Sequence, residues 1–152
     1  TIVLCTTNAL GARTGVATGI VAIVASSVTG GVGVWTIWMS VAVLAIAAIG
    51  AVVGRTSRTD DWFSRAAVIR LGIAALLATI AWDLITTIGG LASYAAPGLT
   101  FAQALLAAML TGIMFTFTHV VWVIALTTVG GPPLLHALAR ARPRLDGGLI
   151  VD

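Results

Sequence analysis

The sequence predicts an all-α protein, a polytopic bundle of transmembrane helices, and three observations carry this prediction. Hydrophobic residues make up 59% of the 152-residue chain and charged residues only 9%, against about 25% charged residues in a soluble domain. The apolar residues form long runs, and a bilayer core needs about 20 apolar residues per helix. Apart from Arg70 and Asp83, the charged residues lie outside these runs. We therefore expect one integral membrane domain over residues 1–152.

Four apolar runs predict four complete helices, separated by short polar or glycine-rich loops. The last run closes with Gly130-Gly131-Pro132-Pro133, which predicts the end of a helix because proline lacks the N–H donor and has a fixed φ. Residues 130–152 are then expected to form a basic cytoplasmic tail. The expected helices cover, approximately, residues 14–29, 34–54, 66–91 and 101–129.

The first ten residues predict part of a further helix. They are mostly apolar and precede Arg13, but ten residues are too few to cross a bilayer. The segment has neither the basic n-region nor the cleavage pattern of a signal peptide, and the chain does not begin with Met. We therefore expect the end of a helix whose beginning is missing, that is, an N-terminally truncated domain.

All eight arginines fall on one side of the expected membrane, and the chain has no lysine. The loops at 30–33 and 93–98, on the other side, contain no arginine. The positive-inside rule then places the arginine side and the C-terminus in the cytoplasm of a multi-pass cell-membrane protein. Because this rule accounts for the net charge of +3, no nucleic-acid partner is expected. The arginines are Arg13, Arg55, Arg58, Arg65, Arg70, Arg140, Arg142 and Arg144.

Asp83 is the one acidic residue inside an apolar run. An Asp at the centre of a membrane helix costs roughly 2.5–3.5 kcal/mol, so it is a functional candidate by default; the alternative is a hydrogen bond to a neighbouring helix. At a rise of 1.5 Å per residue, Asp83 lies outside the middle of its run and His119 lies on the cytoplasmic side of its own. The two are then about 12 Å apart in depth. We expect no direct contact between them without a helix tilt or an intervening water.

Aromatic and hydroxyl residues near the outer ends of the helices are candidates for a binding pocket. The alternative for the aromatic residues is a belt at the membrane interface, and for the threonines a hydrogen bond to their own i−4 carbonyl. No spacing of His, Cys and Asp predicts a metal site, no cofactor is expected, and the single Cys5 fits a small buried thiol. The candidate substrate-binding residues are Trp35, Trp38, Asp83, Thr86, Thr87 and Tyr94, with Gln103 and Thr111 as weaker candidates.

Two stretches resemble a known family. They are GARTGVATGIVAIVASSVTGGVGVWTIW, residues 11–38, and FTFTHVVWVIALTTVGGPPLLHALARAR, residues 115–142. Both are similar to segments of the substrate-binding S component of energy-coupling factor (ECF) vitamin transporters. The resemblance implies a fold of six transmembrane helices with both ends in the cytoplasm. The four runs would then match helices three to six, and residues 1–10 the end of helix two.

The resemblance also implies a function. An S component binds a vitamin or related micronutrient at its outer face and docks on a membrane T component that carries two ATPase subunits. ATP hydrolysis makes the S component topple and release its cargo inside. This chain lacks a Walker-type Gly-Lys loop, so it is not expected to be an enzyme. Two alternatives remain: a structural or assembly subunit held together by Asp83 and His119, and a proton-coupled carrier that uses them as relay groups.

Overall fold

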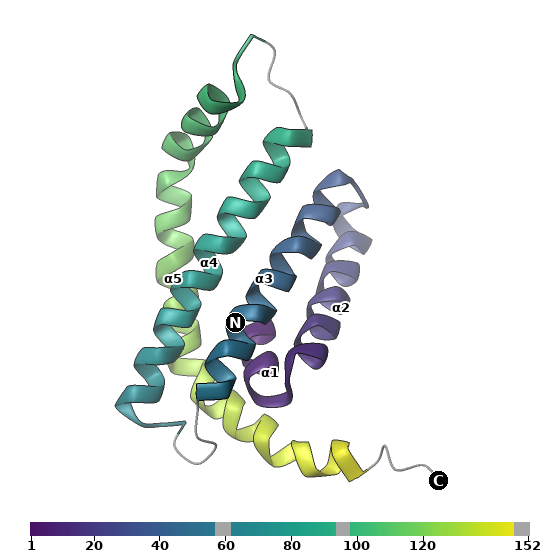
Figure 1. Ribbon diagram of the computed structural model, residues 1–152, viewed down its shortest axis with the longest axis vertical. Coiled ribbons are helices and arrows are strands. Elements are labelled where there is room, and N and C mark those ends of the chain that lie inside the picture. The colour runs from purple at the N-terminus through teal and green to yellow at the C-terminus, as the bar shows by residue number, and fades with distance from the viewer. Residues whose placement is uncertain (57–61, 94–97, 148–152) are drawn as a thin grey trace.

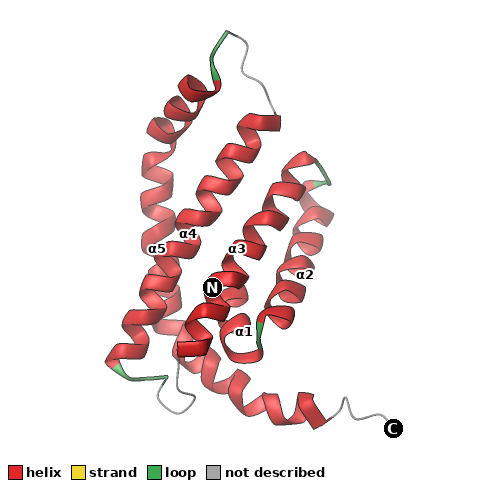
Figure 2. Cartoon of the chain, viewed as in Figure 1, coloured by secondary structure: helices red, strands yellow, loops and turns green. Residues whose placement is uncertain are grey.

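The computed structural model describes residues 1–56, 62–93 and 98–147, and all regular elements in this part of the chain are α-helices (Figure 2). The fold is therefore all-α, as predicted. Three of the helices, α3, α4 and α5, are long and apolar enough to cross a membrane, whereas the apolar stretch of α2, Ala12–Val28, is shorter. The helices are α1 (Ile2–Leu10), α2 (Ala12–Gly30), α3 (Val34–Thr56), α4 (Arg65–Ser93) and α5 (Phe101–Gly147).

The helices α2 to α5 stand side by side and alternate in direction (Figure 1). We call the end with the α2–α3 turn and the α4–α5 connection the upper end, and the opposite end the base. The arginines at the helix ends lie at the base: Arg13 at the start of α2, Arg55 in the last turn of α3 and Arg65 at the start of α4. Arg58 and Tyr94 lie outside the described residues. The described arginines near the helix ends are therefore gathered at one end, as predicted.

The short helix α1 lies within the bundle at the base and contacts α2, α3 and α5. Two glycines of α3 let its backbone come close. A Cβ atom at Gly54 would lie 2.8 Å from the backbone oxygen of Asn8, and one at Gly50 would lie 3.0 Å from that of Leu4. Small residues permit this approach where lipid gives no hydrophobic drive for helix association. The helix α1 is thus a largely buried part of the bundle, with its first residue Ile2 exposed.

The helix α5 does not end at Gly130-Gly131-Pro132-Pro133, so that prediction was wrong. It continues to Gly147 and bends, so that its last part runs across the base (Figure 1). Prolines within a helix remove hydrogen bonds and produce kinks. Burial of the leucines that follow offsets this loss, because Leu135 is fully buried and Leu134 and Leu138 are partly buried. Residues 130–147 therefore continue α5, and the part of this segment up to Leu138 packs on the base.

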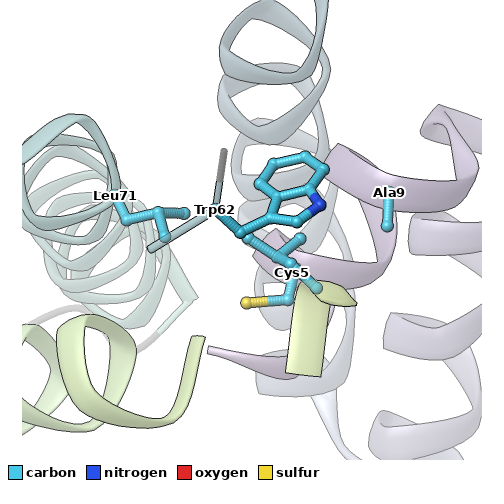
Figure 3. Close-up of a cluster of buried hydrophobic side chains, with 5 residues drawn as sticks. Cys5, Ala9, Trp62 and Leu71 are labelled. Carbon is cyan, nitrogen blue, oxygen red and sulfur yellow. The ribbon is translucent and has the colours of Figure 1, made fainter. Parts of the chain in front are cut away.

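The base is held together by an apolar cluster that joins four segments of the chain (Figure 3). Cys5 and Ala9 come from α1, Leu71 from α4 and Leu135 from α5, and Trp62 precedes α4. All five side chains are buried. The N-terminal helix α1 and the last part of α5 therefore share one small apolar core, which holds the helices together at the base.

Candidate functional site

A cavity of about 360 Å³ lies between the upper halves of α3, α4 and α5. Its volume is in the range of small-molecule sites, which is about 300–1,000 Å³. The wall combines bulky aromatic rings with hydroxyl groups and one carboxylate. The lining residues are Trp35, Trp38 and Met39 of α3, Trp82, Asp83, Thr86 and Thr87 of α4, and Gly112, Phe115 and Thr116 of α5.

Five of the eight candidate residues are brought together in this cavity: Trp35, Trp38, Asp83, Thr86 and Thr87. They come from α3 and α4, and all five lie in the upper halves of these helices. Their similar depth along the two helices was the basis of the prediction. Sequence reasoning did not select Trp82, although it stands next to Asp83 and its large ring reaches the same space. Gly112 and Thr116 were also not selected. The spacing of four residues from Gly112 to Thr116 and of three from Thr116 to His119 places all three on one face of α5, which could have identified them.

Of the other three candidates, Gln103 and Thr111 do not line the cavity. Tyr94 lies outside the described residues. Gln103 caps α5, because its Oε1 accepts hydrogen bonds at 2.9 Å from both the backbone N–H and the hydroxyl of Thr100, the arrangement of a capping box. Thr111 is exposed and its hydroxyl donates to the carbonyl of Ala107 at 2.9 Å. Both side chains thus satisfy the local backbone of α5.

Trp38 is fixed in the wall by a specific set of contacts. Its Nε1–H donates to Ser93 Oγ at 3.0 Å, and the hydroxyl of Ser93 donates to the carbonyl of Gly89 at 2.7 Å. The ring lies directly over Gly89, where any Cβ atom would overlap it. Gly33 gives Trp35 room in the same way. Gly33 before α3 and Gly89 in α4 therefore have a packing role at this site.

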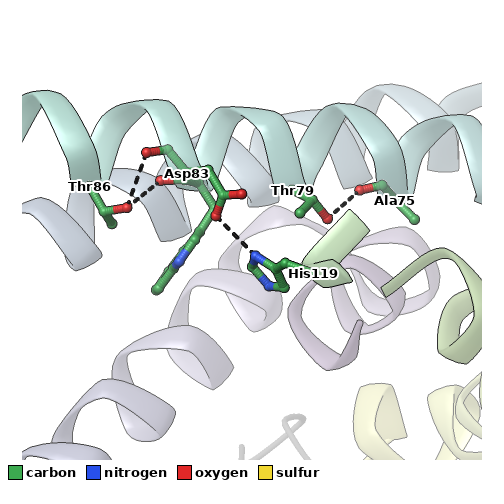
Figure 4. A network of polar contacts seen from close by, with 6 residues as sticks. Ala75, Thr79, Asp83, Thr86 and His119 are labelled. Atoms are coloured by element: carbon green, nitrogen blue, oxygen red, sulfur yellow. Dashed lines mark hydrogen bonds and ion pairs between the residues drawn. The ribbon is translucent and has the colours of Figure 1, made fainter. Parts of the chain in front are cut away.

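Asp83 and His119 are in direct contact, which corrects the predicted separation in depth. His119 Nδ1 and Asp83 Oδ1 lie 2.9 Å apart and join α4 to α5 (Figure 4). The prediction placed the midpoints of the two apolar runs at the same depth. In the structure α5 rises beyond the upper end of α4, so that Gly72 lies opposite Thr128 and Asp83 opposite His119. A shift of about eight residues along α5 removes the expected 12 Å.

The carboxylate of Asp83 is only partly satisfied by this contact. Its side chain is 13% exposed and that of His119 is 30% exposed. The second oxygen, Oδ2, is buried and accepts no hydrogen bond from any described residue. Thr86 and Thr79 do not supply one, because their hydroxyls donate to backbone carbonyls of α4 (Figure 4). A buried acceptor without a hydrogen-bond partner is costly. A ligand group that donates a hydrogen bond to Asp83 Oδ2 would remove that cost.

A second, smaller cavity of about 190 Å³ lies nearer the base, between α1, α3, α4 and α5. Trp82 lines both cavities, whereas Asp83 lines only the upper one and His119 only the lower one. The Asp83–His119 contact therefore bridges the two spaces beside the ring of Trp82.

Comparison of the chain with models of protein families, with characterised proteins and with solved structures finds no match. Within the described residues, no group of three or more His, Cys, Asp or Glu side chains is arranged to hold a metal ion. The chemistry that the site offers is therefore that of aromatic faces, threonine hydroxyls and the Asp83–His119 pair.

Proposed function

We propose that this chain is a membrane-embedded substrate-binding subunit that captures a vitamin or related micronutrient for uptake into the cell. The observation that carries the proposal is the cavity near the upper end, lined by three tryptophans, three threonines and one carboxylate. The lining residues come from three helices that are long and apolar enough to span a membrane. A concave site with many apolar groups and a few polar ones is the usual form of a small-molecule site.

The proposed transporter is of the ECF type, with this chain as its S component. The resemblance of residues 11–38 and 115–142 supports this assignment. The partners would be a T component and two ATPase subunits in the same membrane. They would supply the ATP hydrolysis, since this chain has no lysine and hence no Walker-type Gly-Lys loop. The arginines at the base support an orientation with the base and the C-terminal end in the cytoplasm and the cavity toward the outside.

We expect an impermeant maleimide to label the variant Val32→Cys, but not Arg55→Cys, in intact cells. Val32 is 83% exposed in the upper turn and Arg55 is in the last turn of α3 at the base. The native Cys5 is fully buried, so it gives little background. After the cells are permeabilised, both variants should react. Labelling of Arg55→Cys in intact cells at the rate of Val32→Cys would contradict the orientation.

We expect Gly112→Trp to block binding. Gly112 lines the cavity and a Cβ atom there has no neighbour within 4 Å, so the indole would fill the cavity. The ligand is found by a thermal-shift screen of micronutrients on the purified protein, and its affinity is then measured by calorimetry. The affinity of Gly112→Trp should fall by at least about tenfold, because a ligand that shares the cavity with the indole would be overpacked.

Gly130→Trp is the matched control for this test. Gly130 lies on the same helix, is exposed, has equally free space and is not among the cavity residues. Its affinity should equal that of the unchanged protein. Equal affinities for all three proteins would show that the ligand binds elsewhere, and would remove the cavity as the site.

A proton-coupled carrier is the second candidate, because the Asp83–His119 contact bridges the upper and lower cavities. An acid and an imidazole in contact inside a membrane are typical of proton relays. A carrier of this kind needs no ATPase partner, and a protonophore stops its uptake. An S component needs the ATPase partners. Uptake measured in cells with and without those subunits, and with and without a protonophore, separates the two. A structural subunit, in which the contact only ties α4 to α5, would take up nothing.

A further inference from the structure

We infer that the cavity between α3, α4 and α5 selects an organic cation, a compound with a flat ring and a positive charge on or beside that ring. This inference rests on the proposed function, because it names the chemical class of the cargo. It follows from three features of the cavity wall: its aromatic side chains, the absence of described Lys and Arg residues beside Asp83 in the lining, and the Asp83 oxygen that has no hydrogen-bond partner.

Aromatic side chains line the cavity from all three helices. Trp35 and Trp38 belong to α3, Trp82 to α4 and Phe115 to α5, and all four line the same space. An aromatic ring carries negative charge on its face, so a cation within about 6 Å of the ring centre is attracted, and Trp is the strongest of these partners. Several such rings around one space form the aromatic cage that recognises quaternary ammonium groups.

The charge of the cavity wall has one sign. Among the described residues that line the cavity, Asp83 is the only Asp, Glu, Lys or Arg. The described arginines near helix ends lie at the base, the opposite end of the bundle. A ligand carboxylate or phosphate would therefore meet the carboxylate of Asp83, and no described arginine lines the cavity to pair with the anion. In a space of low dielectric constant, that repulsion excludes an anion and favours a cation.

The Asp83 carboxylate is held in place and still has capacity to interact. Oδ1 contacts His119 Nδ1 at 2.9 Å, whereas Oδ2 has no partner among the described residues. This contact with His119 Nδ1 fixes the orientation of the carboxylate and occupies only one of its two oxygens. A cationic group of the ligand can interact with Oδ2, the oxygen that accepts no hydrogen bond from the described residues.

Two hydroxyls add direction to this attraction. In the part of the chain that the structure describes, the side chains of Thr87 and Thr116 line the cavity and make no hydrogen bond to the protein. They lie on α4 and α5, so they can bind polar substituents on a ring placed between the two helices. The site thus offers aromatic rings for stacking, the carboxylate of Asp83 for a positive charge, and the hydroxyls of Thr87 and Thr116 for hydrogen bonds.

The test uses one ring in three charge states: 1-methylnicotinamide as the fixed cation, nicotinamide as the neutral form and nicotinate as the anion. Binding to the purified full chain in lipid nanodiscs is measured by calorimetry. The cation should bind at least about tenfold more tightly than nicotinamide, a difference expected from cation–π and charge attraction in a desolvated site. Nicotinate should not bind.

Variants of two lining residues test whether the cavity wall causes the preference for the cation. Asp83→Asn should reduce the affinity for 1-methylnicotinamide by about tenfold, the effect of losing one charge-assisted contact, and should reduce the affinity for nicotinamide by much less. Trp35→Leu should weaken cation binding, and Trp35→Phe should restore part of it because a ring face returns. If Asp83→Asn does not fold, as judged by its melting curve, the Trp35 pair decides.

The failures of the two proposals are distinguishable. If nicotinamide or nicotinate binds as tightly as the cation and Gly112→Trp blocks it, the cavity is a binding site but the inference of a cationic cargo is wrong. If 1-methylnicotinamide shows no saturable binding, the inference is also overturned; the proposed function survives only if the micronutrient screen finds another ligand that Gly112→Trp displaces. Binding of the cation that Asp83→Asn leaves unchanged removes Asp83 from the recognition.

Discussion

His119→Leu is expected to lower the free energy of unfolding by about 2 kcal/mol, the value of a hydrogen bond to a charged group. The variant removes the donor that lies 2.9 Å from Asp83 Oδ1 and replaces it with an apolar side chain. Because the other oxygen already lacks a partner, the whole carboxylate is then left without one from the described protein. Unfolding in mixed micelles of increasing denaturing-detergent content measures the loss.

The double variant decides between charge and simple packing. Adding Asp83→Asn to His119→Leu removes the unpaired charge, so about 1 kcal/mol of the loss should return. The double variant is thus expected to be more stable than His119→Leu alone. Losses that add up would show that the two side chains are not coupled. A coupling close to 0.6 kcal/mol, the average for side-chain hydrogen bonds between membrane helices, would show that charge adds nothing to this contact.

The same measurements separate a structural role from a binding role. If Asp83 and His119 only tie α4 to α5, the variants change stability and leave ligand affinity unaltered. If Asp83 faces the cargo, Asp83→Asn lowers affinity more than it lowers stability. The 13% exposure of Asp83 and its place in the cavity wall favour the second outcome.

Helix positions were predictable from the sequence because the pattern that defines them is local. The runs predicted for 34–54 and 66–91 agree closely with α3 (Val34–Thr56) and α4 (Arg65–Ser93). The grouping of arginines at the base was predictable for the same reason, since alternating helices bring every second loop to the same end. Five residues that line the cavity were predicted in the same way, because their depth along α3 and α4 depends only on their position in each apolar run.

The end of α5 and the Asp83–His119 contact were not predictable in this way, because each depends on packing between distant segments. Pro132 and Pro133 would end an isolated helix, but the leucines beyond them are buried against α1 and α4. The register of α5 against α4 is likewise set by contacts such as Gly72 with Thr128. The apolar length of α5 permits several registers, and only the packing selects the one that joins Asp83 to His119.

Gly89→Ala is expected to reduce ligand affinity by at least about tenfold, while Gly90→Ala leaves it unchanged. A methyl group on Gly89 would overlap the ring of Trp38, so the ring must leave its place in the cavity wall and its hydrogen bond to Ser93 is lost. Such overpacking typically costs about 1–3 kcal/mol of stability. At Gly90 a Cβ atom meets nothing within 4 Å, so the higher helix propensity of alanine should stabilise the protein by up to about 1 kcal/mol.

The two glycines are neighbours on one helix and receive the same substitution, so backbone propensity cancels in the comparison. What differs is the contact with Trp38, and through it the shape of the cavity. Calorimetric affinities and melting temperatures of the two variants, measured with the same ligand, isolate that contact. A Gly89→Ala protein that binds as tightly as Gly90→Ala would show that the position of Trp38 does not matter for binding. The ligand would then have to be held by the α4 and α5 walls alone, with Asp83 and the threonines as its main contacts.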